Sequence, residues 1–374
     1  MAESYFPDSA PALSARLDAY LAALAERLAA APFAPAVTVL ALGGGYGRGE
    51  GGIFRATPDA EPTLYNDLEF YLVVQPRAAD PARAWAAAEA HRGETAVGIE
   101  VEFKVLAAPA LAAAAPSMFY CDLVAGHRFV WGDAAFLPGL APRLGDPTRI
   151  PAHEATRLLF NRGAGLFYAQ CALARGDSRV HDGFVERNHA KCRLALADAV
   201  LALNGRHHGS CRERAARLAG PLGRVPPGWA QLRDWHREGV EFKLHPRHRH
   251  PEAAALGAAQ AQLATAWREV FLWAEGLRLG RTFPDATAYA TASGRLLPEF
   301  SAARNVLLHL RDRLRRGGAL PGWTDYPRAA LQRCLGPLLA NDDAGRRLAA
   351  GLLGCAPETA ALESAFRRWW VHYN

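Results

Sequence analysis

Apolar side chains recur along the first third of the chain with the periods of both helices and strands. Leucines at three- and four-residue intervals across residues 10–31 form one face and predict a helix. The β-branched run at 37–42 and the apolar run at 67–74 predict buried strands. Residues 99–106 alternate strictly between apolar and polar side chains, which predicts a half-buried strand. An alanine-rich helix is expected between the last two strands, at residues 80–92.

Helical periodicity dominates the chain after about residue 150, and a short strand or turn near residues 127–131 precedes the change. Helices are predicted at 153–175, 184–204, 210–219, 252–278, 298–315, 326–339, 343–353 and 357–372. The pattern predicts an α/β (α+β) protein. A small mixed-sheet domain over residues 1–140 is followed by a larger all-helical domain over residues 141–374.

The length and composition suit a folded two-domain protein. The chain has 374 residues, of which 50% are hydrophobic, so a sizeable core is available. No stretch is as long and apolar as a membrane span, and the N-terminus lacks the basic start and apolar centre of a secretory signal. We therefore expect a cytoplasmic protein without a membrane partner. The six cysteines lack metal-site spacing and are interpreted as reduced thiols.

The charge of the chain favours a small anionic ligand over a nucleic acid. The formal net charge is +6 and lysine occurs only three times, so arginine supplies most of the positive charge. Together with abundant alanine, this composition is typical of a GC-rich bacterial genome. No long basic stripe or aromatic stacking platform is evident, so a nucleic-acid partner is not favoured. A nucleotide remains compatible with the charge.

A glycine-rich segment at residues 43–51 directly follows the first predicted strand. Glycine allows positive φ and a close approach of the backbone to a ligand, and successive amides in such a turn can bind phosphate oxygens. The segment is not a Walker A loop, because no Gly-Lys-Ser/Thr follows. It fits the dinucleotide-binding fingerprint poorly, because it leads into a long loop, expected at 53–65, and then an acidic strand.

Acidic side chains gather on two of the predicted strands. Asp67 and Glu69 are two residues apart in a strand and therefore project from the same face. Adjacent carboxylates repel each other, and a magnesium ion removes that cost. A third carboxylate, from Glu102 or from Glu100 on the same face, would complete a two-metal site for phosphoryl transfer. The alternatives are a solvated edge strand for the first pair and an exposed Glu102 paired with Lys104.

The combination of these two elements carries a family resemblance. The run Gly-Gly-Tyr-Gly-Arg-Gly-Glu at residues 44–50, followed by Asn-Asp-Leu-Glu at residues 66–69, resembles the polymerase-β-like nucleotidyltransferase superfamily. It is most similar to the minimal and kanamycin-nucleotidyltransferase-like branch. Two features depart from the family pattern: the loop between the runs is longer, and the second acid is glutamate. The resemblance covers about the first third of the chain.

The resemblance implies a role for each matching residue. The residues implied to ligate two Mg²⁺ ions and to act in catalysis are Asp67, Glu69 and Glu102. The residues implied or proposed to bind the nucleotide are Gly44, Gly45, Tyr46, Arg48, Arg187 and Lys191. Of these, Arg48 has an alternative partner in Glu50, and the two basic residues of the helical part have a solvated helix face as their alternative.

The predicted function is a magnesium-dependent nucleotidyltransferase. It transfers a nucleoside monophosphate, with AMP as the first candidate and the base preference left open, from an NTP to a hydroxyl of a small-molecule or protein acceptor. The alternatives are a non-catalytic nucleotide-binding or partner-binding protein on the same fold, and a helical scaffold. The acceptor and the oligomeric state stay open. Two histidine-containing segments have no assigned chemistry: His207-His208, expected to favour a helix dipole, and the basic stretch 245–250, with metal, acidic-partner and inert alternatives.

Overall fold

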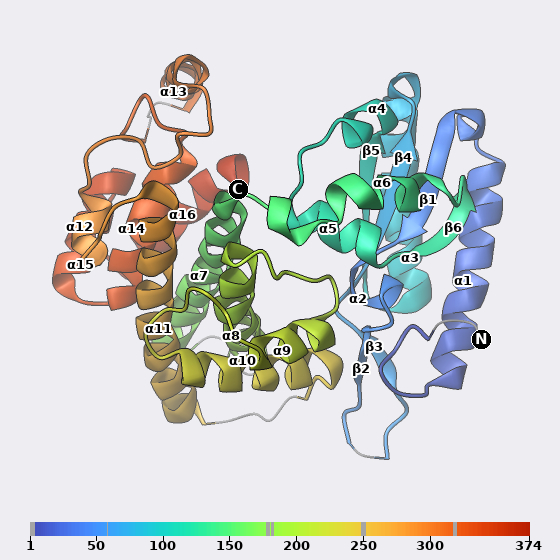
Figure 1. Cartoon of the computed structure of the whole chain (residues 1–374), viewed down its shortest axis with the longest axis horizontal. Helices are drawn as coiled ribbons and strands as arrows, with labels where there is room; N and C mark the ends of the chain where they lie inside the picture. Colours follow the sequence, from blue (N-terminus) through green and yellow to red (C-terminus); the bar gives the residue numbers. More distant parts are fainter. Residues whose placement is uncertain (1–3, 58, 177–179, 181–182, 248–251, 317–319) are drawn as a thin grey trace. The chain divides into compact units, whose positions relative to one another are not determined.

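The computed structural model describes every residue except 1–3, 58, 177–179, 181–182, 248–251 and 317–319. The fold is mixed α/β with helices predominating around a small mixed sheet, as expected from the sequence (Figure 1). The chain forms two compact units. Unit 1 comprises Met1–Glu154, Asn204–Gly223 and Arg237–Arg247, and unit 2 comprises the remaining segments. The domain boundary expected at residue 140 stays a prediction.

The sheet of unit 1 contains the four strands expected from the sequence. They are β1 (Val37–Leu42), β4 (Asp67–Val74), β5 (Glu100–Ala107) and β6 (Arg128–Gly132). Their order is β5-β4-β1-β6, with β4 and β5 parallel and the other neighbours antiparallel. Strand β4 is therefore an inner strand, which excludes the solvated-edge alternative for its acidic residues.

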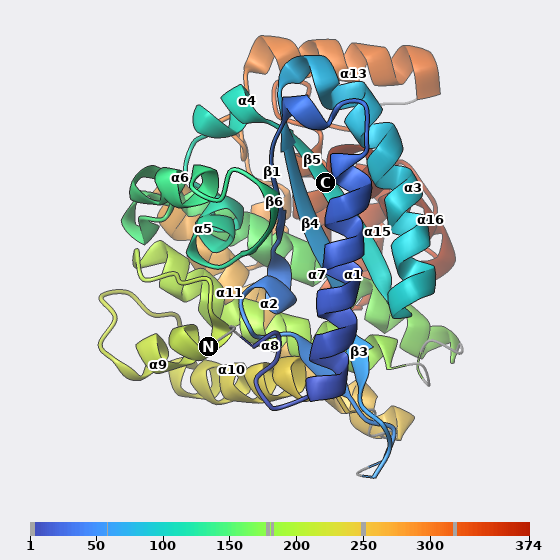
Figure 2. The same ribbon diagram turned by 90° about the vertical axis from the view of Figure 1, so that its right-hand side faces the viewer.

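One face of the sheet is covered by α1 (Pro11–Ala29) and α3 (Ala79–Val97) (Figure 2). All five leucines that predicted α1 are buried against this face. Strand β4 contributes Leu68, Phe70 and Leu72 to the same core. Burial of these apolar side chains against α1 and α3 orients β4. Asp67 and Glu69 alternate with them along the strand, so they lie on its opposite side.

The other face of the sheet is covered by three short helices, α4 (Ala108–Ala112), α5 (Met118–Ala125) and α6 (Phe136–Leu144). Tyr71 and Val73 of β4 belong to this second core. Asp67 and Glu69 precede them on the same face, because side chains alternate along a strand. The acids therefore lie at the end of this face, beyond its apolar part.

The segment expected as an inserted loop at 53–65 is instead a small hairpin. Strands β2 (Gly52–Phe54) and β3 (Thr63–Tyr65) pair antiparallel as a separate two-stranded sheet. These strands were not predicted, because three residues are too few to show a periodic pattern. A further element, the one-turn helix α2 (Gly44–Gly47), occupies the glycine-rich segment.

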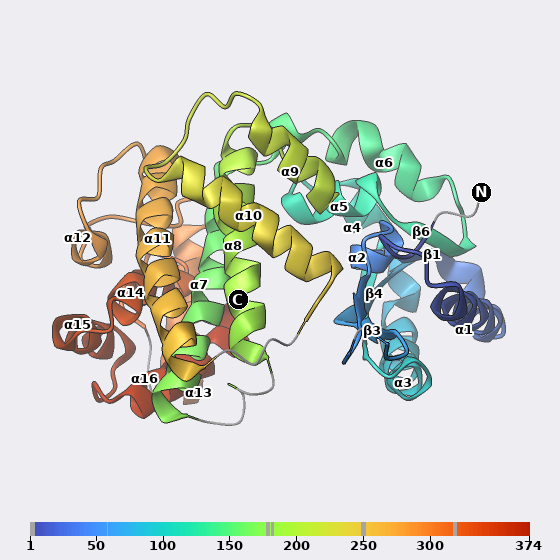
Figure 3. The same cartoon turned by 90° about the horizontal axis from the view of Figure 1, so that it is seen from below.

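Most helices of the later chain were predicted closely. The expected ones are α7 (Ala152–Arg175), α8 (Phe184–Leu203), α9 (Cys211–Ala219), α11 (Ala253–Leu279), α13 (Ala302–Arg316), α14 (Arg328–Ala340), α15 (Asp343–Leu353) and α16 (Thr359–Tyr373). In unit 2, α8 and α11 pack along each other (Figure 3). Two helices were missed, α10 (Trp229–Leu244) and α12 (Ala286–Ala290). No helix in the described part of the chain is long and apolar enough to cross a bilayer.

Candidate active site

The glycine-rich turn lies directly against the acidic strand. Helix α2 follows β1 at once, and the amide of Gly43 donates to the carbonyl of Glu69 at 2.8 Å. Gly44 has a φ of +61°, and a Cβ atom at this position would lie 2.9 Å from Oε1 of Glu69. A side chain at this position would be strained by the positive φ and would press on the Glu69 carboxylate, so glycine is favoured. The two elements that carried the family resemblance form one arrangement.

The first turn of α2 presents backbone donors beside this acid. The first intrahelical bond runs from the amide of Gly47 to the carbonyl of Gly43 at 2.8 Å. The amides of Gly44, Gly45 and Tyr46 precede it, so they have no intrahelical acceptor. Amides of this kind can donate to oxygen atoms of a ligand. This is the geometry that a phosphate-binding role for Gly44 and Gly45 requires.

Strand pairing brings the carboxylates of β4 and β5 together. In the parallel register, Asp67 lies opposite Glu100 and Glu69 lies opposite Glu102. All four side chains share one face of the sheet. Glu69 and Glu102 are partly exposed, by 28% and 48%, so both can reach a ligand. Each candidate third acid thus neighbours one member of the first pair, and the choice between Glu100 and Glu102 stays open.

The ammonium group of Lys104 lies between two of these carboxylates. Its Nζ is 3.1 Å from Oε2 of Glu69 and 3.3 Å from Oε2 of Glu102. Burial alone would lower the pKa of Lys104, but the charges and hydrogen bonds of the two glutamates raise it. The ammonium also lies over the rings of Tyr71 and Phe119, at 5.7 and 5.3 Å. The Glu102–Lys104 pair weighed from the sequence is present, and it extends to Glu69.

Tyr71 fixes the orientation of the Glu69 carboxylate. The phenol donates to Oε2 of Glu69 at 2.9 Å. Burial and the charge of Glu69 raise the pKa of Tyr71, so the phenol stays protonated as a donor. A Cβ at Gly43 would lie 2.2 Å from this ring, so glycine is needed there too. Oε2 of Glu69 is thus held by Tyr71 and Lys104, while Oε1 is the atom nearest to Gly44.

The donor set suits a divalent cation in its chemistry but is already neutralised. Carboxylate oxygens are the ligands that Mg²⁺ prefers. As the side chains stand, the described residues contain no group of three or more His, Cys, Asp or Glu side chains placed to hold a metal. Lys104 takes the place between Glu69 and Glu102 that a cation would take. Asp67, Glu69 and Glu102 would hold Mg²⁺ once the ammonium group moved aside.

Arg48 lies at the end of the glycine-rich turn, near the carboxylate of Asp122. Its stem lies close against Gly126 and Gly209, where an added Cβ would clash with it or touch it. Burial would raise the pKa of Asp122, but a hydrogen bond from His207 and the charges of Arg48 and Arg214 lower it. Arg48 thus adds positive charge beside the glycine turn.

His207, which follows a helix in the sequence, pairs with a carboxylate. Its Nε2 donates to Oδ1 of Asp122 at 2.7 Å, and the imidazole is almost fully buried while the carboxylate is 30% exposed. The expected interaction with a helix dipole stays a prediction beside this charge-assisted hydrogen bond. The pair ties the segment after α8 to the sheet domain within unit 1.

Glu50 closes the glycine-rich run and is a structural residue. Only 4% exposed, it accepts hydrogen bonds from the Ser210 hydroxyl at 2.6 Å and from the amides of Cys211 and Arg212 at 3.0 and 3.3 Å. Lys243 lies 3.6 Å away. Burial would raise the pKa of Glu50, but Lys243 and these bonds lower it to about 2. The carboxylate thus binds the start of α9 rather than forming the Arg48–Glu50 pair weighed earlier.

Three further candidates have different surroundings. The side chain of Tyr46 is 2% exposed, donates to the carbonyl of Tyr65 at 2.8 Å and accepts from its amide at 2.8 Å. Its side chain is therefore part of the core, and only its backbone can reach a ligand. Arg187 is half-buried and Lys191 is exposed, both on α8 in unit 2. Their role in nucleotide binding stays a prediction.

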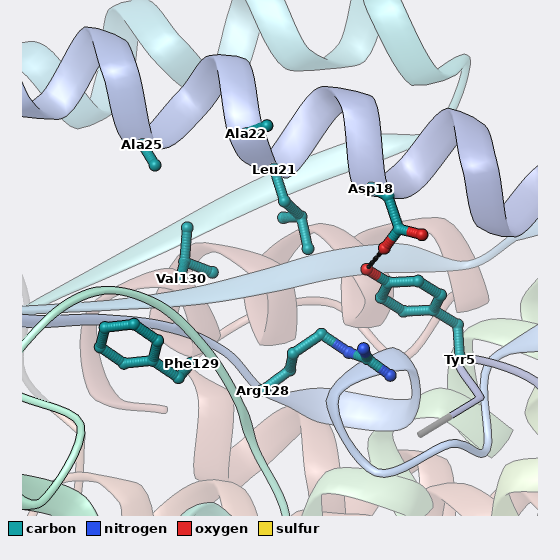
Figure 4. A pocket seen from close by; sticks show the side chains of 8 residues that line it. All are labelled: Tyr5, Asp18, Leu21, Ala22, Ala25, Arg128, Phe129 and Val130. Carbon is teal, nitrogen blue, oxygen red and sulfur yellow. Dashed lines mark hydrogen bonds between the residues drawn. The ribbon is translucent and has the colours of Figure 1, made fainter. Parts of the chain in front are cut away.

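Two other features contain none of the predicted site residues. A pocket of about 240 Å³ lies between α1 and β6 (Figure 4). In it, Tyr5 donates to Asp18 at 2.5 Å and stacks under the guanidinium of Arg128 at 3.8 Å. In the basic stretch, Nδ1 of His245 lies 3.2 Å from Asp8, while residues 248–250 lie outside the described residues.

The contacts that the sequence did not reveal join residues far apart in the chain. Lys104 reaches Glu69 across 35 positions, and His207 reaches Asp122 across 85. Strand alternation placed Lys104 on the acidic face, but only the parallel register brings it to Glu69.

No protein-family model matches the chain, and a search of curated proteins finds no match.

Proposed function

We propose that this chain is a magnesium-dependent nucleotidyltransferase. It transfers a nucleoside monophosphate, with AMP as the first candidate, from an NTP to a hydroxyl of a small-molecule or protein acceptor in the cytoplasm. The observation that carries the proposal is the position of the glycine turn against Glu69, through the hydrogen bond from the Gly43 amide to the Glu69 carbonyl, with Glu102 beside Glu69 in the sheet. It combines backbone phosphate donors with carboxylates in one place, which neither motif provides alone.

Each residue has a definite part in this proposal. The amides of Gly44 and Gly45 donate to oxygens of the triphosphate, and Arg48 adds positive charge beside them. Asp67 and the two glutamates would hold Mg²⁺, which would supply electrostatic stabilisation of the phosphoryl transfer. The acceptor oxygen forms a bond to the α-phosphorus as the bond to pyrophosphate breaks. The hydroxyl proton passes to a carboxylate of β5.

Lys104 supplies a positive charge within the proposed site. Its ammonium neutralises Glu69 and Glu102, which would otherwise repel each other on neighbouring strands. In our proposal, Mg²⁺ held by these carboxylates would replace the ammonium as the neutralising charge. Lys104 is 32% exposed, so its flexible side chain could turn towards solvent when the glutamates bind another cation.

The test uses Asp67→Asn with ATP labelled in the α-phosphate and a panel of sugar, aminoglycoside and protein acceptors. We expect transfer to fall by about 10²-fold or more, because a charged metal ligand is lost. The matched control is Asp80→Asn, at an aspartate of α3 that is 94% exposed. Label on protein or on a small molecule identifies the acceptor class. Transfer that is unchanged in Asp67→Asn would exclude the proposed site.

A second candidate function is nucleotide binding without transfer. The observation that favours it is the position of Lys104, which already neutralises the two glutamates. Magnesium-dependent ATP binding by the wild-type chain, with no pyrophosphate release against any acceptor, would support this alternative. Release of pyrophosphate that depends on Asp67 would exclude it.

A further inference from the structure

Helix α13 of unit 2 has its amphipathic faces reversed. It lies at the periphery of its unit (Figures 1 and 2). Its buried side chains are polar: Asn305, His309 and Asp312. Its leucines on the opposite face are exposed: Leu307 by 66%, Leu310 by 42% and Leu314 by 85%. A surface helix of a self-sufficient domain ordinarily buries its apolar face, so these leucines call for a partner.

Specific hydrogen bonds hold the polar face inward. Asn305 donates through Nδ2 to the carbonyl of Thr324 at 3.1 Å. His309 donates through Nε2 to the carbonyl of Asp325 at 3.1 Å. Asp312 accepts a hydrogen bond from the last tyrosine of α16. Turning the leucines inward would leave these buried polar groups without partners, so the exposed leucine face is built into the fold.

The exposed apolar face has the spacing of a coiled-coil seam. Its members are Ala303, Leu307, Leu310 and Leu314. The steps of four, three and four residues place them at successive d, a, d and a positions of a heptad. At 100° per residue they cover an arc of roughly 60° of the helix. This arc is narrower than the apolar face of a helix that lies in a membrane surface, and it matches the contact of one helix with another.

Arginines flank this seam on both sides. Arg304 and Arg311 fall at e positions and Arg313 at a g position, and all three are exposed. The acidic residue of α13 is Asp312, which is buried. A second copy of the helix would set arginines against arginines, which disfavours self-pairing. Acidic e and g positions on a partner would instead match this charge.

We propose that the face formed by Ala303, Leu307, Leu310 and Leu314 docks an amphipathic helix with acidic flanks from another protein. The leucines supply the buried contact and the arginines select the partner by charge. This inference is independent of the proposed transferase activity, because it concerns another surface and a protein ligand. For that reason its test uses a binding measurement on the full chain.

The probe is a fluorescein-labelled synthetic peptide of about three heptads, with Leu at a and d and Glu at e and g. Anisotropy is followed as full-length protein is added. A peptide with Lys at e and g is the charge control. We expect binding of the Glu peptide and about tenfold weaker binding, or none, of the Lys peptide.

Two variants connect binding to the seam. Leu307→Ser combined with Leu314→Ser should weaken binding of the Glu peptide by about tenfold or more. Arg304→Glu combined with Arg313→Glu should reverse the preference in favour of the Lys peptide. All four side chains are exposed, so the unfolding temperature of both variants should match that of the wild type, which checks their fold.

Other outcomes would overturn the proposal. Equal binding of both peptides would show unspecific apolar contact, and binding of neither would remove the docking role. Binding to vesicles of anionic phospholipid that depends on the leucines, with no peptide binding, would make the face a membrane contact. A dimer in light scattering that the double serine variant abolishes would make a second copy the occupant.

Discussion

Nζ of Lys104 lies 3.1 Å from Oε2 of Glu69, so a lysine of the edge strand neutralises an acid of the inner strand. The same nitrogen lies 3.3 Å from Glu102. The ammonium group thereby stabilises two carboxylates that lie close together on adjacent strands. In the proposed function, this internal cation is the group that a metal–nucleotide complex replaces.

Lys104→Met removes the internal cation and keeps most of the side-chain volume. We expect the unfolding temperature without metal to fall by about 2–4 °C, because the carboxylates of Glu69 and Glu102 then repel each other. Millimolar Mg²⁺ should raise it more in this variant than in the wild type. Thermal unfolding with and without Mg²⁺ measures both effects. Lys104→Arg, which keeps the charge, is the control, and an identical response of Lys104→Met and wild type to metal would contradict the prediction.

Gly44→Ala tests whether the contact between the turn and the acid matters for ligand binding. The new Cβ would press on Glu69 at 2.9 Å in a residue with φ of +61°. Gly98→Ala is a matched control, because Gly98 has φ of +77° and no atom within 4 Å of an added Cβ. Both variants should lose about 1 kcal/mol of stability from the backbone conformation. Only Gly44→Ala should weaken magnesium-dependent ATP binding, measured by calorimetry, and equal ATP binding in both variants would speak against the site.

Tyr46→Phe tests whether the phenol of Tyr46 contributes to stability or to ATP binding. The phenol bonds to both backbone groups of Tyr65, and its loss leaves them buried without this partner. We expect about 1–3 kcal/mol less stability in urea unfolding, with ATP affinity unchanged. Tyr120→Phe, at a half-buried tyrosine whose hydroxyl makes no hydrogen bond among the described residues, should change little. A large loss of ATP affinity in Tyr46→Phe would restore the ligand-binding role expected from the resemblance.

Helices and strands with one buried face could be predicted from the periodicity of their apolar residues. The leucine repeat of α1 and the strict alternation of β5 each report one buried face, and both elements form as expected. Helix α10 was missed because its buried residues, such as Leu232 and Trp235, are spaced among many charged ones. The hairpin β2–β3 has strands of three residues, which is too short for a two-residue alternation to be recognised.

The candidate site shows the same division between local and distant information. Two-residue spacing placed Asp67 and Glu69 on one face, but the glycine turn reaches them through the antiparallel pairing of β1 with β4. The partners of the site residues could not be predicted, because they depend on strand register and on tertiary packing. Thus the sequence could not show that Glu50 binds the start of α9, since 160 positions separate it from Ser210.

Glu50 makes stability depend on pH in the acid range. Its pKa is about 2 in the folded chain against 4.5 for an ordinary glutamate, so the folded state favours the charged form. This contribution is fully present above pH 4.5. It is lost as the pH falls from about 4.5 towards 2, where the folded state must also take up the proton. We therefore expect unfolding free energy to decrease across this window.

Glu50→Gln should remove this contribution at neutral pH. The amide cannot attract Lys243, and it places a donor opposite the donors of Ser210, Cys211 and Arg212. We expect a loss on the order of 3 kcal/mol at pH 7, measured by urea unfolding, and a difference from wild type that shrinks towards pH 2. The control is Glu213→Gln on α9, the helix whose start Glu50 binds; the Glu213 carboxylate is 45% exposed and pairs with Arg217. Its removal should matter far less, because water solvates both charges after the pair is broken. A loss in Glu50→Gln that stays constant from pH 7 to pH 2 would mean that the side chain acts through packing rather than through its charge.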